Sequence, residues 1–301
     1  MIRMEKDSRS RENQPRNAAG LTEEEFLARY EPGKYERPSL TVDMLLFTID
    51  EGELKLLLVK RKDHPYIGCW AFPGGFVGIN ESIEEAMYRE LKEETNVDRV
   101  YMEQLYTWGD VDRDPRMRVV SVSYLALAPK TALKPSAGDD AAEVAWFIVK
   151  KQPLLDYDGQ GLKNEAYLLS LTSEDGAVKI AYIVTERQRK NGVLNIVETH
   201  LELFPGTAQR LAFDHQKAVN LALERLKNKV NYTPIAFNLM PEEFTLGQLQ
   251  KVYETLLGKT LYKANFRKKI FPMVIETEKK TENVKHRPSQ FYRFNPDYKE
   301  E

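Results

Sequence analysis

The strongest constraint on the fold is one segment, residues 74–97, with the sequence GGFVGINESIEEAMYRELKEETNV. Ile83, Met87 and Leu91 recur at a spacing of four residues, which predicts a helix over Ser82–Thr95 with one face turned to a core. The Gly74-Gly75 pair follows a proline, so the backbone can turn tightly and bring a carbonyl or amide near a metal or phosphate. The segment therefore predicts a tight glycine turn followed by a half-buried helix.

Three glutamates lie close together on this predicted helix. At about 100° per residue, Glu93 lies about 60° to one side of Glu90, and Glu94 lies about 40° to the other. Carboxylates this close repel one another and cost stability unless a partner neutralises them. A hard divalent cation with oxygen ligands is such a partner, and Arg89 can pair with a carboxylate to fix its rotamer. Glu81 is expected at the helix start, from where it reaches the site out of the loop.

The spacing of the charged residues decides between a metal site and a solvated, charge-rich surface helix. A glycine, five residues, a glutamate, seven residues and then Arg-Glu-Leu-x-Glu-Glu resembles the motif of the Nudix hydrolase family, over roughly residues 35–229. The resemblance implies a Mg²⁺ or Mn²⁺ site with Glu90 and Glu94 as main ligands and Glu93 in support. It also implies that Arg89 orients the glutamates and that Glu81 helps bind metal or orient water. Family substrates are diphosphates linked to another group.

The motif departs from the family pattern at one position, where Asn96 replaces the usual glycine. Asparagine tolerates the left-handed conformation that ends a helix, so we expect the fold to survive this change.

Two downstream segments indicate which diphosphate is bound. The sequences VDRDPRMRVVSVSYLAL and AGDDAAEVAWF, from residues 111 and 137, resemble the ADP-ribose pyrophosphatase branch of the family. Arg113 and Arg116 can contact a diphosphate or ribose bidentately, and the backbone of Gly74 and Gly75 is the other candidate substrate contact. The alternative is a loop that is held by surface ion pairs.

A loop carboxylate before the Trp146 strand can act as the general base, and Glu143 is our candidate, with Asp139 and Asp140 nearby. Solvated acids in a structural turn explain these residues equally well.

The rest of this region predicts a layered α/β domain, a Nudix α/β/α sandwich with a mixed sheet. Apolar runs predict strands at Thr41–Asp50, Leu54–Lys60, Val119–Ala128 and Val144–Val149, and a last helix at Asp214–Lys229. Strands at Val178–Thr185 and Val193–Leu203 predict a β-hairpin insertion, about residues 178–203, whose role the sequence does not indicate.

Composition sets the broad class. A chain of 301 residues has room for two cores, and 42% hydrophobic with 30% charged residues is typical of globular proteins. Cys69 is the only cysteine, which excludes an intrachain disulfide and fits a reducing cytoplasm. No apolar run approaches the roughly 20 residues that a membrane helix needs, and no signal peptide is recognisable. We expect a cytoplasmic protein without a membrane partner, in which residues 1–34 are disordered apart from a short helix at Leu21–Tyr30.

A second domain is predicted over residues 231–301, after a Nudix domain over 35–230. Thr245 and Gln248 form a capping box that opens a helix, and a second helix through NFRKKI ends near Pro272. Val274–Glu276 and Gln290–Phe294 then read as a two-stranded wing. Helix, turn, helix and wing is an arrangement that docks on DNA.

Charge is concentrated in this C-terminal region. Residues 259–293 hold seven lysines and three arginines against three glutamates, 10 − 3 = +7, whereas the whole chain carries −2. Such segregation is the electrostatic pattern of phosphate contacts, although a basic solvated face or a protein-protein module gives it too. The candidate DNA-contacting residues are Asn265, Arg267, Lys268, Lys269 and Arg287.

The pairing of the two domains resembles the Nudix-related transcriptional regulators of NAD metabolism, the NrtR type, through FTLGQLQKVYE, NFRKKI and RPSQFYRF. The resemblance implies a homodimer whose winged helix binds operator DNA and is released by ADP-ribose. The hairpin insertion and Pro272 depart from the family pattern, and the intact motif leaves catalysis open. Two alternatives remain: a plain ADP-ribose pyrophosphatase whose basic tail serves assembly, and a sugar-responsive regulator without catalysis.

Overall fold

The computed structural model describes residues 14–97, 99–133, 141–154, 164–191, 193–281 and 288–299. The chain divides into two compact units, Met1–Pro38 and Ser39–Glu301. In the first unit, the expected helix is α2 (Glu23–Arg29), followed by the 3₁₀ helix η1 (Pro32–Lys34). Thr22 and Glu25 form a capping box at the start of α2, in which each side chain accepts a hydrogen bond from the other residue's backbone N–H.

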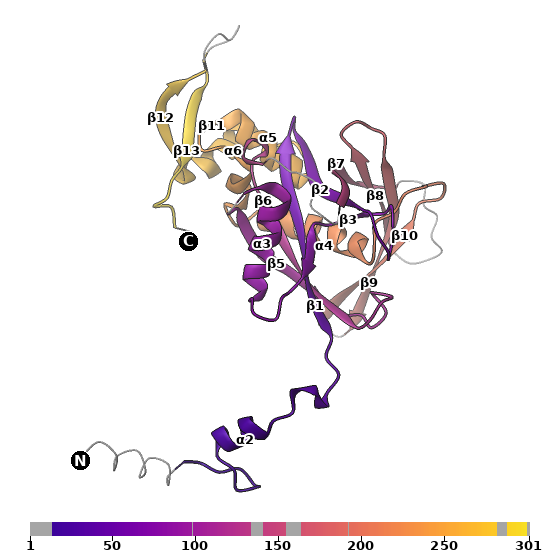
Figure 1. Cartoon of the computed structure of the whole chain (residues 1–301). Coiled ribbons are helices and arrows are strands. Elements are labelled where there is room, and N and C mark those ends of the chain that lie inside the picture. Colours follow the sequence, from indigo (N-terminus) through magenta and orange to yellow (C-terminus); the bar gives the residue numbers. More distant parts are fainter. Residues whose placement is uncertain are drawn as a thin grey trace, which may run out of the picture. The chain divides into compact units, whose positions relative to one another are not determined.

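The second unit is built on a ten-stranded mixed sheet (Figure 1). Its main path runs β10-β9-β8-β7-β2-β1-β6-β5, while β3 pairs with β2 and β4 pairs with β1. The pair β1–β6 is parallel and the other pairs are antiparallel. The strands are β1 (Ser39–Asp50), β2 (Glu53–Arg61), β3 (Trp70–Ala71), β4 (Gly74–Phe76), β5 (Tyr101–Trp108), β6 (Val119–Leu127), β7 (Ala141–Pro153), β8 (Asn164–Ser173), β9 (Lys179–Asn191) and β10 (Leu194–Leu203).

Strand β1 is buried on both faces because helices cover both. Its side chains alternate: Leu45 and Phe47 pack in one core with α4 (His215–Lys229), and Met44 packs in another with α3 (Ile83–Thr95). A strand buried on both sides reads as a continuous apolar run, which is why MLLFTI was recognisable. The expected α/β/α sandwich with a mixed sheet is confirmed.

The hairpin that was expected as an insertion continues the main sheet. Strand β9 pairs with β8, and β8 pairs with β7, so the hairpin is the outer part of an antiparallel run. Leu169 and Leu171 of β8, and Val184 of β9, lie in the core under α4. The sequence prediction missed β8, which links the hairpin to the sheet.

The C-terminal part forms the expected helix-turn-helix and wing (Figure 1). Helix α5 (Leu246–Leu257) begins at the Thr245–Gln248 capping box and ends at Gly258, whose φ of 66° is left-handed. Helix α6 (Lys263–Ile270) runs into the 3₁₀ helix η4 (Phe271–Met273), which contains Pro272. A three-stranded sheet follows, in the order β11 (Phe244–Thr245), β13 (Gln290–Phe294) and β12 (Val274–Lys280). We call residues 231–299 the winged helix.

One hydrophobic core runs across the boundary that the sequence predicts at residue 231. Leu226 of α4 and Val230 lie in the same buried cluster as Leu249 of α5 and Leu239 of the 3₁₀ helix η3 (Ile235–Leu239). The domain limits therefore remain a sequence-based proposal. In the part of the chain that the structure describes, no helix is long and apolar enough to cross a membrane.

Candidate functional site

Helix α3 is fixed at both ends by local contacts. Ser82 caps its start: the Ser82 side chain accepts from the Glu85 N–H at 3.2 Å, and the Glu85 carboxylate accepts from the Ser82 N–H at 2.7 Å. Asn96 ends it at a φ of 57°, in the left-handed conformation that the sequence predicts, and its N–H donates to Lys92 O. These caps hold the register of the charged residues on the helix.

Arg89 gathers three of the predicted carboxylates. Its Nε and Nη2 atoms donate to the two oxygens of Glu81, at 3.2 and 2.9 Å. Its Nη1 atom donates to Glu90 Oε1 at 2.7 Å and reaches Glu93 Oε2 at 3.4 Å. Glu81 lies in the loop before α3, as expected, and also accepts from the Gly78 N–H at 2.7 Å. The arrangement agrees with an orienting role for Arg89, which stays a proposal.

The pKa values of Glu81 and Glu90, the two carboxyl groups closest to Arg89, are shifted in opposite directions. Hydrogen bonds from Arg89 lower the pKa of Glu81 to about 2. Burial raises the pKa of Glu90, and the Arg89 guanidinium opposes that rise. Glu90 is 7% exposed, whereas the Glu93 side chain is 56% exposed. Glu90 is therefore the buried acid of the cluster and Glu93 its exposed neighbour.

The donors in this cluster fit a hard divalent cation in kind, because all of them are carboxylate oxygens. Gly75 leaves space for one of these carboxylates, since a Cβ at this position would lie 2.2 Å from Glu90 Oε1. Among the described residues, no three His, Cys, Asp or Glu side chains stand together as a ready metal site. Arg89 donates to Glu90 through Oε1 alone, so the remaining carboxylate oxygens can accept a cation while Arg89 keeps its contacts. Glu90, Glu94 and Glu93 remain the residues that would hold it.

A cavity of about 250 Å³ lies beside α3. Its lining includes all four residues predicted to bind substrate, Gly74, Gly75, Arg113 and Arg116, and also the half-buried Glu94. The turn, the carboxylate helix and the arginine loop, far apart in sequence, thus meet at one site. The sequence prediction missed other lining residues, namely Asp43, Phe76 and Phe213. Phe72 and His215 also line the cavity.

The two cavity arginines are held differently. Arg113 is buried, and its Nε and Nη2 atoms donate to Asp214 at 3.2 and 2.7 Å. Arg116 is more exposed, pairs with Asp114 at 2.8 Å, and lies 5.4 Å from the centre of the Phe76 ring. The loop is therefore held by ion pairs, one of them buried, and it still presents both arginines to the cavity.

His215, the first residue of α4, forms part of the cavity wall. Its Nδ1 atom accepts from the Phe72 N–H at 3.1 Å, and its ring stacks on Phe72 at 4.2 Å. Burial lowers the pKa of His215, although Asp43 lies 3.8 Å from its Nε2 atom. A neutral ring therefore forms this wall.

The proposed general base is not placed at the cavity. Glu143 lies on β7 opposite Lys60 of β2, and its carboxylate is 3.4 Å from Lys60 Nζ. It is not among the residues that line the cavity. The alternatives Asp139 and Asp140 lie outside the described residues.

Helix α6 carries most of the candidate DNA contacts. Asn265, Arg267 and Lys268 are exposed on it. Lys269 is exposed as well, and its Nζ atom donates to the Asn231 carbonyl at 2.9 Å, while partial burial lowers its pKa. Its contact with DNA phosphate, like those of the other three residues, stays a prediction. Arg287 lies outside the described residues.

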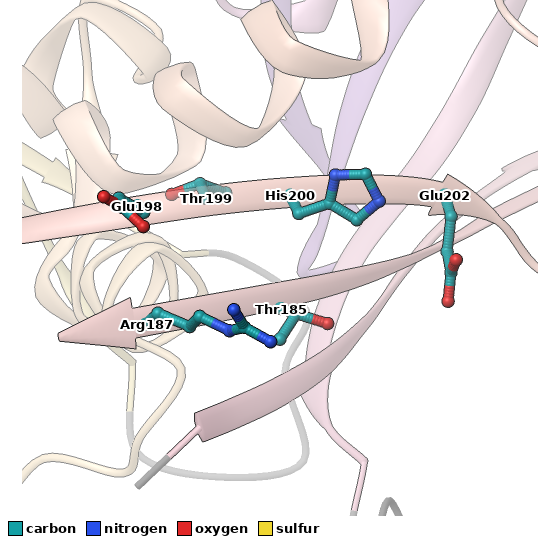
Figure 2. Close-up of a pocket in the computed structure, with 6 residues that line it drawn as sticks. All are labelled: Thr185, Arg187, Glu198, Thr199, His200 and Glu202. Atoms are coloured by element: carbon teal, nitrogen blue, oxygen red, sulfur yellow. The ribbon is translucent and has the colours of Figure 1, made fainter. Parts of the chain in front are cut away.

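A separate hollow of about 340 Å³ lies on the hairpin β9–β10 (Figure 2). Figure 2 shows Thr185 and Arg187 on one strand and Glu198, His200 and Glu202 on the next. The hairpin forms one edge of the sheet, and the strands β8, β7 and β2 separate it from β1. This hollow is therefore not part of the carboxylate site.

Two family models match the chain: the NUDIX domain over residues 38–163 and the NrtR DNA-binding winged helix domain over residues 236–294. The chain is also 30% identical to the ADPR responsive transcriptional repressor NtrR of Acinetobacter baylyi, over 91% of this chain and 88% of that protein. The chain belongs to the NrtR family. The crystal structure of Shewanella oneidensis NrtR complexed with a 27mer DNA is similar to this NrtR-family chain at 31% identity and a TM-score of 0.60, covering 86% of this chain and 94% of that one. The ADP-ribose pyrophosphatase of Methanocaldococcus jannaschii is 40% identical over 41% of this chain and 70% of that protein.

Proposed function

We propose that this protein is a DNA-binding transcriptional regulator of NAD metabolism that senses ADP-ribose or a related nucleoside diphosphate derivative. The carrying observation is that one chain joins a carboxylate-lined cavity to an exposed basic helix. Its relatives support both halves, since one is an ADPR responsive repressor and another was crystallised with DNA. We propose a cytoplasmic location, where the chain can reach operator DNA. A homodimer suits a winged helix that reads two half-sites of an operator.

We also propose that the protein hydrolyses its ligand, converting ADP-ribose to AMP and ribose 5-phosphate. Support comes from the complete carboxylate set and from the pyrophosphatase relative. When bound, Mg²⁺ or Mn²⁺ neutralises the diphosphate and activates the water that attacks phosphorus. Glu90 and Glu94, with Glu93, would hold the cation, and Arg89 keeps Glu81 and Glu90 in place. Arg113 and Arg116, which line the cavity together with Glu94, would bind the anionic part of the ligand.

The test measures DNA binding and hydrolysis together. A duplex selected by the protein from a random-sequence pool is titrated with protein, with and without ADP-ribose, and fluorescence anisotropy gives the affinity. We expect ADP-ribose to weaken DNA binding about 5–150-fold, the range of ordinary coupling energies. Glu94→Gln should lower turnover by orders of magnitude while the protein stays folded, because it removes a metal ligand rather than core packing. In that variant the effect of ADP-ribose on DNA should last longer.

Two alternative functions predict other outcomes. If ADP-ribose is hydrolysed and no duplex is selected, the chain is a plain pyrophosphatase whose basic tail serves assembly. If DNA is bound but ADP-ribose neither binds nor is cleaved, a sugar-responsive regulator without catalysis becomes the better explanation. Light scattering of the free and DNA-bound protein tests the homodimer, because its molar mass is twice the 34.8 kDa of one chain.

A further inference from the structure

Helix α4 extends from the cavity to the winged helix. Its first residue, His215, and the preceding Phe213 line the cavity. Its last turn contributes Leu226 to the core that also holds Leu249 of α5. The helix has 15 residues, and at about 1.5 Å per residue it spans roughly 22 Å. A single rigid element therefore contacts both functional regions.

The cavity end of α4 is tied by a buried ion pair. Asp214, the residue before the helix, accepts two hydrogen bonds from Arg113, and the side chains are 10% and 4% exposed. Arg113 lines the cavity. A phosphate that enters the cavity offers oxygen acceptors to the same guanidinium N–H groups, so it competes with Asp214. In a buried setting such an exchange of partners has a large electrostatic effect.

The other end of α4 is tied to the DNA-facing helix. The chain turns directly after α4, where Thr233 N–H and Oγ1 both donate to Lys229 O, at 2.8 and 2.9 Å. Within this turn the Asn231 carbonyl accepts the bond from Lys269 of α6. The Lys269 Nζ atom lies 5.6 Å from the centre of the Tyr253 ring, so its position is fixed from two sides. These contacts connect the turn after α4 to α6.

The contact of α5 with the sheet takes another route. Thr255 Oγ1 donates to the Gly52 carbonyl at 2.8 Å, in the turn between β1 and β2. This contact involves neither α4 nor the cavity. It gives a matched control for variants that loosen the junction without touching α4.

We propose that α4 transmits ligand binding to the DNA-binding helix. The anionic part of the ligand draws Arg113 away from Asp214, the first turn of α4 is released, and the shift reaches α6 through Asn231 and Lys269. This inference rests on the proposed function, since it supplies the route by which the ligand alters DNA affinity.

The first experiment compares two neighbouring lysines. Lys269→Met keeps the aliphatic stem over Tyr253 and removes the donor to Asn231, while Lys268→Met removes an equal charge from the exposed surface. DNA affinity is measured with and without saturating ADP-ribose, and the ratio is the coupling factor. Lys269→Met should reduce this factor at least about threefold. Lys268→Met should weaken DNA binding and leave the factor within about twofold of wild type.

The second experiment tests the cavity end. Asp214→Asn removes the charge that ADP-ribose must displace, so it should also reduce the coupling factor. In the double variant with Lys269→Met, the reduction in coupling energy should be smaller than the sum of the two single reductions, because both residues act on one route. Thr255→Val, the control at the junction, should leave the factor unchanged. Calorimetry with ADP-ribose establishes for each variant that the cavity is occupied.

The outcomes separate this inference from the proposed function. If wild type is coupled and both Asp214→Asn and Lys269→Met keep full coupling, the α4 route is wrong and the regulator stands. If ADP-ribose binds wild type without changing DNA affinity, the regulatory function fails and the α4 route with it. Hydrogen exchange on wild type needs no variant: ADP-ribose should change amide protection in residues 215–233 and 263–270. Coupling without a change in protection at 215–233 overturns the route.

Discussion

At the residue scale, the carboxylate of Glu90 leaves no room for a side chain at position 75, so this residue must be a glycine. A Cβ at Gly75 would lie 2.2 Å from Glu90 Oε1 and 3.0 Å from the carboxyl carbon. Gly75→Ala should therefore displace the carboxylate and weaken Mn²⁺ binding by at least about tenfold, equal to about 1.4 kcal/mol. The cost in folding stability should stay near 1 kcal/mol, because the end of a flexible side chain moves.

The control for this prediction is Gly109→Ala, because nothing lies within 4 Å of a Cβ placed there. Calorimetric titration with Mn²⁺ and thermal unfolding are measured for both variants. Unchanged Mn²⁺ affinity in Gly75→Ala would show that Glu90 is not a ligand.

The pair Arg89–Glu81 gives a pH prediction. Hydrogen bonds from Arg89 lower the pKa of Glu81 from 4.5 to about 2. A lowered carboxyl pKa stabilises the folded state above the unfolded pKa, so this contribution is present above pH 4.5 and is lost as the pH falls toward 2. Arg89→Lys removes the planar fork that engages both Glu81 oxygens. In this variant an NMR titration should find the pKa of Glu81 closer to 4.5, and acid unfolding should begin at higher pH. A titration that matches wild type would refute the assigned cause.

The sequence predicted the residues of this cluster because they share one helix and its capping loop. It did not predict the partner of Arg113, since Asp214 is distant in the chain and only the packing of α4 brings them together. Asp43 was missed for the same reason: it lies in an apolar strand and carries no local signal for the cavity. The bond from Lys269 to Asn231 was not predicted either, because charge alone cannot show which acceptor a lysine side chain meets.

At the element scale, α6 allows a quantitative prediction for DNA binding. Arg267, Lys268 and Lys269 are all exposed on this helix, but Lys269 also donates to the Asn231 carbonyl. Each lost phosphate contact should reduce the slope of log affinity against log salt by about 0.9. Arg267→Ala and Lys268→Ala should each show this change, and Lys269→Ala should show a smaller one. Equal slopes for all three variants would mean that Lys269 also reaches phosphate.

The periodicity of apolar residues predicted most of the helices and strands, and the strands that it missed have features that explain why. Strand β5 was missed because it is an edge strand in which Leu105 alone is fully buried, so it lacks the apolar run of β1. Strand β8 places Leu168 beside Leu169 and breaks strict alternation. Without β8 the following hairpin had no neighbour in the prediction and was interpreted as an insertion.

At the scale of the whole molecule, the two regions share more than a linker. The sequence predicted a domain boundary at residue 231 because the residue pattern changes there. The NUDIX family model ends before this boundary, at residue 163, and the winged helix model begins after it, at residue 236. The core nevertheless continues from α4 through η3 to α5. A shared core of this kind suits a regulator, because the winged helix cannot move independently of the element that lines the cavity.

Removing residues 231–301 tests how far this sharing extends. The remaining chain keeps α3, α4 and the ten-stranded sheet, so we expect it to fold, to bind Mn²⁺ and to have lost DNA binding. It also exposes Leu226 and Val230, which are 1% and 0% exposed in the full chain. Exposing a buried side chain of this size costs about 1.5–3 kcal/mol, so the melting temperature should fall by several degrees. Replacing Leu226 with Gln in the truncated chain should cost little, because that side chain then faces water, whereas the same change in the full chain should be strongly destabilising. Thermal unfolding of the full and truncated chains, each with and without the Leu226→Gln change, measures this difference.

If the truncated chain is unfolded, the two regions are one cooperative unit. If Leu226→Gln destabilises the full and truncated chains equally, Leu226 is not buried by the winged helix.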